Sequence, residues 1–152
     1  MSYSVDTSSL MDAWVRYYPP DVFETLWKRF DNLIDAGHLV AIDEVRRELE
    51  KKEDDLCKWI VARPKMLVTL DEAIQGRANP IINRFPSLTN TKSVMRGAAD
   101  PFVIALAQER NLTVVTAESP KPTKPRIPDV CASLGVPCIT LVELFRREGW
   151  HV

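Results

Sequence analysis

Residues 100–116, DPFVIALAQERNLTVVT, contain the pattern that decides the fold. Asp100 followed by Pro101 is typical of a helix start, with an acidic N-cap and a proline in the first turn. The predicted helix continues through apolar residues and stops near Asn111, and the β-branched run 112–116 follows it directly. A helix joined at once to an apolar strand is typical of α/β proteins, in which helices cover a parallel sheet.

The same alternation of strands and helices extends in both directions from this stretch. Strands are predicted at 2–6, 38–42, 112–116 and 136–141, and 65–70 is either a fifth strand or an extended loop. Near-continuous apolarity suits strands that are buried on both faces. The prediction is an α/β fold with a mainly parallel sheet of four or five strands, in a single domain that spans residues 1–152.

Helices are predicted between these strands: at about 22–34, at 43–60, at 100–111, at 127–134, and after a capping box formed by Thr140 and Glu143. Gly37 and Gly135 each supply a left-handed residue that ends a helix. The segment 71–96 contains Pro80 and Pro86, which interrupt helices. Two short helices and a loop are therefore predicted there.

Composition narrows the class of protein. The chain is 45% hydrophobic and 27% charged, as in an ordinary globular domain, and its net charge is −1. Any contact with nucleic acid must therefore come from a local basic patch. Residues 119–128, SPKPTKPRIP, are predicted to form an exposed basic loop, because four prolines exclude a helix interior.

The cellular setting follows from two further features. No window approaches the roughly 18 apolar residues of a membrane span, so no membrane association is expected. Cys57, Cys131 and Cys138 lack the CxxC spacing of a metal site, and they are predicted to be reduced thiols packed in the core. Together these features predict a soluble cytoplasmic protein.

Carboxylates recur where strands end and helices begin. Asp6 follows the first predicted strand, Glu118 follows a later strand, Asp100 opens a helix, and Glu44 and Glu48 lie one helical turn apart. In parallel sheets, ligands bind beyond the carboxyl ends of the strands. Several carboxylates in one cleft repel one another unless a cation lies among them, and all-oxygen ligands favour Mg²⁺ or Mn²⁺. Such a site is suited to phosphodiester hydrolysis.

Each acid also has a purely structural interpretation. Asp100 alone is explained as an N-cap, Asp6 as the start of a turn, and Glu118 as a loop acid. Glu44 and Glu48 lie among basic residues, as on a solvated salt-bridged helix face. The pattern by itself leaves a metal site and scattered surface acids equally open. It contains no GxSxG, GxxxxGK[ST] or GxGxxG motif that would indicate another chemistry.

Four segments in order resemble the motifs of PIN-domain nucleases of the toxin–antitoxin type: VDTSSL (5–10), DEVRREL (43–49), ADPFVIALA (99–107) and VVTAES (114–119). The resemblance extends over nearly the whole chain. It implies a three-layer α/β/α sandwich and a Mg²⁺- or Mn²⁺-dependent endoribonuclease, the toxin of a toxin–antitoxin pair. Hydrolysis by a metal-activated water would leave 5′-phosphate and 3′-hydroxyl ends.

The resemblance also implies roles for individual residues. Asp6, Glu48 and Asp100 correspond to the metal-binding catalytic acids, and Glu118 corresponds to the fourth catalytic acid. Ser8 and Thr116 match polar supporting positions, and Glu44 is an alternative to Glu48. The family commonly has Asp where this chain has Glu118, and Asp129 is a candidate substitute for that missing Asp.

Binding partners are expected on the same grounds. Arg96, Lys121, Lys124 and Arg126 are candidates for contacts with RNA phosphates, although a solvated proline-rich loop explains the last three equally well. An antitoxin would block the acidic cleft. A homodimer is possible through Trp14, Tyr17 and Tyr18, which could as easily belong to the core.

Two rival functions remain. The chain could be a catalytically weak PIN-like scaffold that binds RNA or protein, as the Glu118 departure and the near-neutral charge suggest. It could also be a phosphohydrolase or phospho-acceptor domain in which Asp6 is the nucleophile, although the second Asp of haloacid-type phosphatases is missing from DTS.

Overall fold

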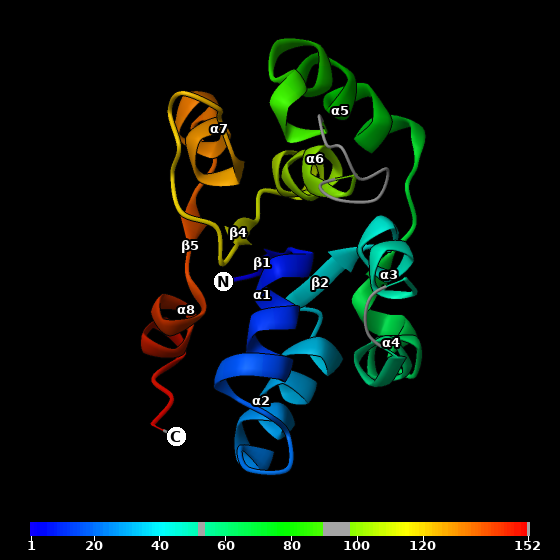
Figure 1. Cartoon of the computed structure of the whole chain (residues 1–152). Helices are drawn as coiled ribbons and strands as arrows, with labels where there is room; N and C mark the ends of the chain where they lie inside the picture. The colour runs from blue at the N-terminus through cyan, green and yellow to red at the C-terminus, as the bar shows by residue number, and fades with distance from the viewer. Residues whose placement is uncertain (52–53, 90–97, 152) are drawn as a thin grey trace.

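The computed structural model describes residues 1–51, 54–89 and 98–151, and five parallel strands form its centre (Figure 1). The strands are β1 (Tyr3–Val5), β2 (Leu39–Ile42), β3 (Leu67–Val68), β4 (Thr113–Val115) and β5 (Cys138–Ile139). They form one sheet in the order β3-β2-β1-β4-β5, and each neighbouring pair is parallel. The α/β fold and the parallel sheet predicted from the sequence are confirmed.

β1 is the middle strand, and the order of the strands reverses beside it. From β1 the chain adds β2 and β3 on one side and then returns to add β4 and β5 on the other. Connections therefore leave the carboxyl ends of β1 and β4 in opposite directions, and this is the place where parallel α/β sheets bind ligands. Asp6 follows β1 directly, and Thr116 follows β4.

Helices cover both faces of the sheet. They are α1 (Thr7–Met11), the π-helix η1 (Asp12–Tyr17), α2 (Glu24–Asp35), α3 (Asp43–Leu49), α4 (Asp54–Val61), α5 (Glu72–Arg84), α6 (Asp100–Arg110), α7 (Ile127–Leu134) and α8 (Leu141–Glu148), with 3-10 turns η2 (Pro64–Met66) and η3 (Pro86–Leu88). Figure 1 shows α5, α6 and α7 on one side and α2 and α8 on the other, which gives three layers. Within the described ranges, no helix combines the length and apolarity that a bilayer crossing demands.

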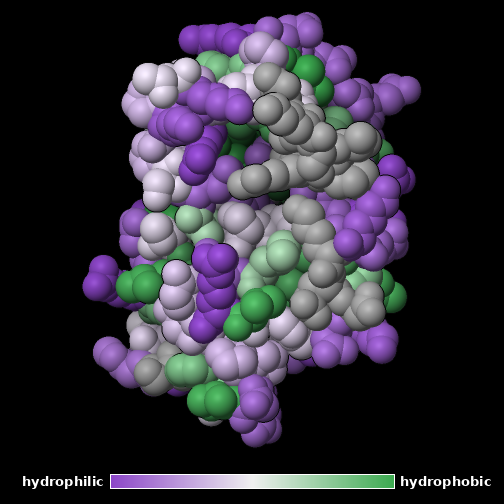
Figure 2. Space-filling model, viewed as in Figure 1, coloured by the Kyte–Doolittle hydropathy of each residue, from purple (hydrophilic) through white to green (hydrophobic). Residues whose placement is uncertain are grey.

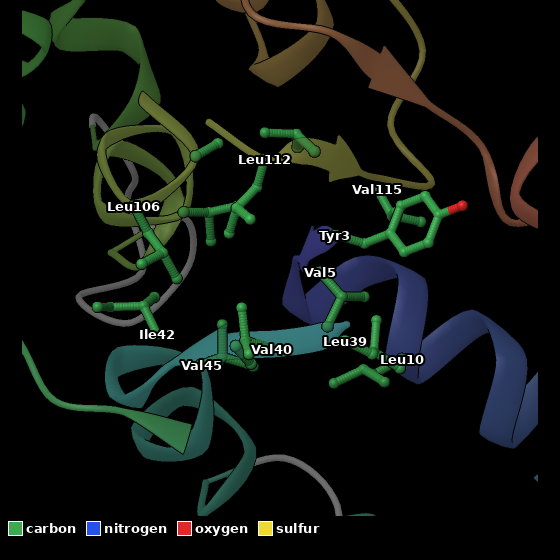
Figure 3. Close-up of a cluster of buried hydrophobic side chains, with 14 of the residues drawn as sticks. Tyr3, Val5, Leu10, Leu39, Val40, Ile42, Val45, Leu106, Leu112 and Val115 are labelled. Carbon is green, nitrogen blue, oxygen red and sulfur yellow. The ribbon is translucent and has the colours of Figure 1, made fainter. Parts of the chain in front are cut away.

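Successive residues of β1 join the sheet to opposite helix layers. The Tyr3 hydroxyl donates to Glu148 Oε2 on α8 at 2.7 Å, whereas Ser4 Oγ donates to the Val103 carbonyl oxygen on α6 at 3.0 Å. This alternation is the period of a strand. Tyr3 and Val5 lie among buried side chains from neighbouring strands and helices (Figure 3).

The three N-terminal aromatic residues are placed differently from one another. The Trp14 ring packs edge-on against Trp27 at 5.0 Å, and the Tyr18 ring packs against Phe145 at 5.3 Å. Tyr17 is 58% exposed. Two of the three aromatics proposed for a dimer interface therefore pack on the core, and Tyr17 alone remains largely open to solvent.

Most boundaries agree with the sequence-based predictions. All four predicted strands are present, and 65–70, for which two interpretations were open, contains β3. The capping box before α8 is confirmed, because Thr140 accepts from the Glu143 N–H at 3.2 Å and Gly149 ends the helix with φ 70°. Helix α7 ends at Gly135 with φ 69°, as predicted.

The single helix predicted at 43–60 is wrong, because α3 ends at Leu49 and α4 begins at Asp54. Residues 50–55 are all charged, so the sequence there offers no apolar side chain to continue the buried face of α3. The buried residues resume with Leu56 on α4.

The predicted break at Pro80 is also wrong, because α5 runs through it from Glu72 to Arg84. Pro80 lacks the N–H that would bond the carbonyl of Gly76. Helix α5 nevertheless packs along α6 and buries Ile74, Ala78 and Ile81, and this burial offsets the missing bond.

Candidate functional site

Asp6 is a buried carboxylate at the carboxyl end of the central strand. Its backbone N–H extends the sheet by donating to the Val115 carbonyl oxygen at 3.1 Å. Its Oδ1 accepts from the Ser9 N–H at 2.8 Å and so caps helix α1. Its Oδ2 accepts from the hydroxyls of Ser8 at 2.8 Å and Thr116 at 2.5 Å. The residue is 1% exposed.

Burial raises the pKa of Asp6, and the hydrogen bonds from Thr116, Ser9 and Ser8 lower it without cancelling that rise. Within the part of the chain that the structure describes, no Lys, Arg or His forms an ion pair with this carboxylate. A buried charge without a counter-charge is costly, and a bound cation would offset that cost.

Glu48 is the second buried acid, on helix α3, and it is 3% exposed. Its Oε1 accepts from the Ala99 N–H at 2.9 Å. Since Ala99 immediately precedes helix α6, this bond satisfies one of the N–H groups that a helix start leaves without a partner. Glu48 is thereby held beside the N-terminus of α6.

Asp100 is the first residue of α6, and Pro101 is the second. The N-cap of this helix is Ala99, which makes no side-chain capping bond, so the predicted N-cap role of Asp100 is wrong. The capping aspartate of the site is Asp6. The sequence allowed two roles for this residue, the start of a turn or a metal ligand. Asp100 is half-buried at the positive end of the helix dipole, next to the Ala99–Glu48 bond.

Thr116 joins Glu118 to Asp6. Its Oγ1 donates to Asp6 and accepts from the Glu118 N–H at 3.1 Å. Ser8 reinforces this link by accepting from the Ala117 N–H at 3.2 Å. The half-buried Glu118 is therefore held two residues beyond a direct partner of Asp6.

The acids thus fall into two associated pairs. Asp6 is linked to Glu118 through Thr116, and Glu48 lies against the residue before Asp100. The pairs approach through the contacts of α6 with β1 and of α1 with α3. Among the described residues, no three Asp, Glu, His or Cys side chains form a group that could hold a metal ion by themselves.

Glu44 lies one helical turn before Glu48 but has different surroundings. Its Oε2 is 4.0 Å from Arg47, and its buried Oε1 has no hydrogen-bond partner among the described residues. The neighbouring Asp43 pairs with Arg46, whose hydrogen bond lowers the pKa of Asp43. The first turn of α3 is thus partly the salt-bridged face that its charges predict.

Asp129 shapes the loop before α7. Its Oδ2 accepts from the Lys121 N–H at 2.7 Å and the Arg126 N–H at 2.9 Å. Desolvation raises the pKa of Asp129, but these backbone donors outweigh it and the net shift is downward. The carboxylate of the proposed substitute acid is therefore engaged in holding a loop closed.

Three cations project from this loop, which begins directly after Glu118. Lys121, Lys124 and Arg126 are exposed, and none of them belongs to a salt bridge within the described ranges. The loop is anchored a second time where Ser87 Oγ donates to the Pro125 carbonyl oxygen at 2.8 Å. Figure 2 shows strongly hydrophilic residues over α7 and the segment that leads into it. The fourth predicted cation, Arg96, lies outside the described residues.

Two backbone groups belong to the site although no motif indicated them. The Ser9 N–H was detectable, because Asp followed three residues later by a helical Ser N–H is an ordinary capping arrangement. The Ala99 N–H carries no such signal, since its partner Glu48 is 51 residues away in the chain.

Comparison with known protein families gives a match over almost the whole chain. The matching model covers residues 3–152, and its family is described as a domain of unknown function (DUF4411). No curated protein matches the chain.

Proposed function

The chain belongs to the DUF4411 family, and we propose that it is a Mg²⁺- or Mn²⁺-dependent endoribonuclease of the PIN type, the toxin component of a toxin–antitoxin pair. The observation that carries this proposal is the Asp6 carboxylate. It is buried at the point where the strand order reverses, and no cationic side chain of the described residues pairs with it. Glu118 is linked to Asp6 through Thr116, and Glu48 bonds to Ala99, the residue before Asp100.

The donor set suits a hard cation. A carboxylate has about four lone-pair sites, and Asp6 uses three in hydrogen bonds, which leaves Oδ1 able to accept one more partner. Asp6, Glu48 and Asp100 would hold the ion, and all of them supply oxygen. With no three acids yet grouped among the described residues, bound solvent would complete the coordination, as Mg²⁺ usually retains several waters.

A bound Mg²⁺ or Mn²⁺ would supply an activated water and neutralise charge that develops on the phosphodiester. The residues of the chain position the reactants. Thr116 and Ser8 hold the Asp6 carboxylate in one orientation, and the Ala99 N–H does the same for Glu48. Lys121, Lys124 and Arg126 would bind flanking phosphates of the RNA.

A cleavage assay tests the proposal. Purified protein is incubated with structured and unstructured RNA in Mn²⁺ or in EDTA, with Asp6→Asn beside the wild type. Asp21→Asn is the matched control, because Asp21 is exposed and lies before α2. We expect cleavage only with metal, its loss in Asp6→Asn and its retention in Asp21→Asn. Cleavage that persists in EDTA or in Asp6→Asn contradicts the mechanism.

A second candidate is a catalytically weak PIN-like scaffold that binds RNA or protein. It is favoured by the division of the acids into two pairs and by the extra methylene of Glu118 relative to Asp. Calorimetry with Mn²⁺ distinguishes the two. Metal binding that disappears in the double variant Asp6→Ala, Asp100→Ala counts against the scaffold, whereas RNA binding without metal binding or cleavage supports it. The near-complete burial of Asp6 weighs against a phospho-acceptor role.

The partners follow from the same proposal. An antitoxin would cover the acidic edge of the sheet and exclude RNA. A homodimer through the N-terminal aromatics would rely on Tyr17, since Trp14 and Tyr18 pack on the core. Size-exclusion chromatography with light scattering tests the homodimer. A protein that is monomeric at all concentrations contradicts it.

A further inference from the structure

Two cysteines meet where α7 turns back into the edge strand β5. Helix α7 ends at Gly135, and the Val136 N–H donates to the Cys131 carbonyl oxygen at 2.9 Å, which folds the chain back on the last helical turn. β5 begins two residues later with Cys138. The turn therefore brings the seventh residue after Cys131 alongside the end of its helix.

The sheet register places the Cys138 side chain on the face that α6 covers, and Cys131 is a buried residue of α7, which contacts both α6 and β5. Cys138 pairs with Val114, and Val114 pairs with Ser4, so the three share one face. Ser4 on that face bonds to α6, which packs beside α7 (Figure 1). Cys131 is one of the buried residues of α7 and is 0% exposed. Helix α7 contacts β5, and each thiol shifts the pKa of the other, so the two side chains lie near each other.

The thiols are not equivalent. Cys138 is half-buried and so open to a small reagent, whereas Cys131 has no exposed surface. Their interaction raises the pKa of Cys131 and lowers that of Cys138, while burial and the charges of Asp6, Glu118 and Glu143 act to raise the latter. Cys138 is thus the thiol that reacts first, and Cys131 is the thiol that follows.

We propose that Cys131 and Cys138 form a redox-active dithiol that closes to an intramolecular disulfide when the protein meets a small-molecule disulfide. The proposal is independent of the nuclease proposal, because it requires neither metal nor RNA.

The chemistry takes place in two exchanges. The Cys138 thiolate attacks the small disulfide, forms a mixed disulfide and releases one small thiolate. Cys131 then loses its proton, attacks the Cys138 sulfur and releases the second small thiolate. Two protein thiols are oxidised, and one small disulfide is reduced to two thiols. The product ties the end of α7 to the edge strand β5.

The third cysteine is the internal control. Cys57 lies on α4, on the other side of β2 from this pair, and it is half-buried like Cys138. A disulfide that depended only on exposure would involve Cys57 as readily as Cys138. A disulfide that depends on proximity joins Cys131 to Cys138 and leaves Cys57 as a free thiol or a mixed disulfide.

The experiment uses the complete folded protein and oxidised glutathione. Free thiols are then alkylated, and the protein is digested with trypsin without reduction. Cys131 and Cys138 fall in one tryptic peptide, 127–146, because no Lys or Arg lies between them. We expect this peptide to lose two hydrogens, to carry neither alkyl group nor glutathione, and to recover two alkylatable thiols after reduction.

Variants resolve the order of the steps. Cys131→Ser is expected to stop at a glutathione adduct on Cys138, and Cys57→Ser to form the disulfide as the wild type does. Two alkylated thiols in peptide 127–146 of the oxidised wild type would overturn the proposal, as would glutathione on both cysteines or a link to Cys57. The wild-type peptide map alone decides the matter if a variant fails to fold.

Discussion

Thr116 donates its hydroxyl to the Asp6 carboxylate at 2.5 Å, across 110 residues of sequence. The same oxygen accepts from the Glu118 N–H. One threonine therefore couples the central strand, its neighbour β4 and the start of the basic loop.

Replacing Thr116 with Val removes both bonds while the shape of the side chain is nearly kept. Hydrogen bonds to charged groups contribute about 1.5–3 kcal/mol, so we expect a loss of that size in the free energy of unfolding. Urea denaturation measures it. Thr123→Val, at an exposed loop position, is the control and is expected to unfold like the wild type. Equal stability of both variants would show that the Thr116 bond contributes nothing.

The stability of the fold depends on pH through Asp6. Its pKa is raised by burial above the ordinary value of 3.8. An acid that holds its proton more tightly when folded contributes stability below its unfolded pKa, and this contribution is lost as pH rises through the folded pKa.

Asp6→Asn should reveal this dependence, because Asn stays neutral and still caps a helix. We expect the variant to be more stable than the wild type at about pH 7, by about 1.4 kcal/mol for each unit of pKa elevation, and to lose that advantage at about pH 3. Urea denaturation at both pH values measures the difference. A constant difference between the two proteins would contradict the assignment.

Metal should act on the same charge. If Mn²⁺ binds at Asp6, a concentration of about 100 times its Kd stabilises the fold by about 2.7 kcal/mol. We expect a higher Tm with Mn²⁺ for the wild type and for the exposed-site control Asp21→Asn, and no change for Asp6→Asn. Differential scanning calorimetry with EDTA as reference makes the comparison. The same rise in all three proteins would mean that the ion binds elsewhere.

Two variants separate the structural role of Glu48 from its proposed catalytic role. Glu48→Gln keeps an oxygen to accept from the Ala99 N–H, whereas Glu48→Ala leaves this buried N–H without its partner. We expect Glu48→Ala to lose about 1–3 kcal/mol and Glu48→Gln to stay near the wild type. Both should abolish RNA cleavage. Cleavage by Glu48→Gln at the wild-type rate would show that the charge is not required.

The basic loop should be visible in the salt dependence of RNA binding. Replacing Lys121, Lys124 and Arg126 together with Ala should reduce the slope of log K against log salt by about 2, at about 0.7 for each phosphate contact with single-stranded RNA. Fluorescence anisotropy measures the slope.

The control triple variant for this measurement replaces Lys28, Lys58 and Arg110, exposed cations on α2, α4 and the far end of α6. An equal change in the slope for both triple variants would indicate a general effect of charge and not binding of RNA phosphates by the basic loop.

The sheet was predictable because β2, β4 and β5 lie in apolar runs between turn residues and β1 lies in a short extended run that ends at Asp6, while 65–70 was a candidate for β3. The prediction that Pro80 interrupts the helix is wrong, because the packing of α5 on α6 outweighs the local tendency of proline to end a helix. The capping role was assigned to Asp100, whereas Asp6 is the capping residue, for a related reason. Sequence shows that an acid precedes a helix, but the φ and ψ angles that decide which residue caps it depend on the incoming chain.

The position of β1 has a consequence for synthesis. β1 is synthesised before its neighbour β4 and before the hydroxyl that fixes Asp6, which are encoded more than a hundred codons later. An incomplete nascent chain that stops before Thr116 therefore cannot form the hydrogen bond that holds the Asp6 carboxylate. The arrangement delays the finished site until Thr116 has been translated.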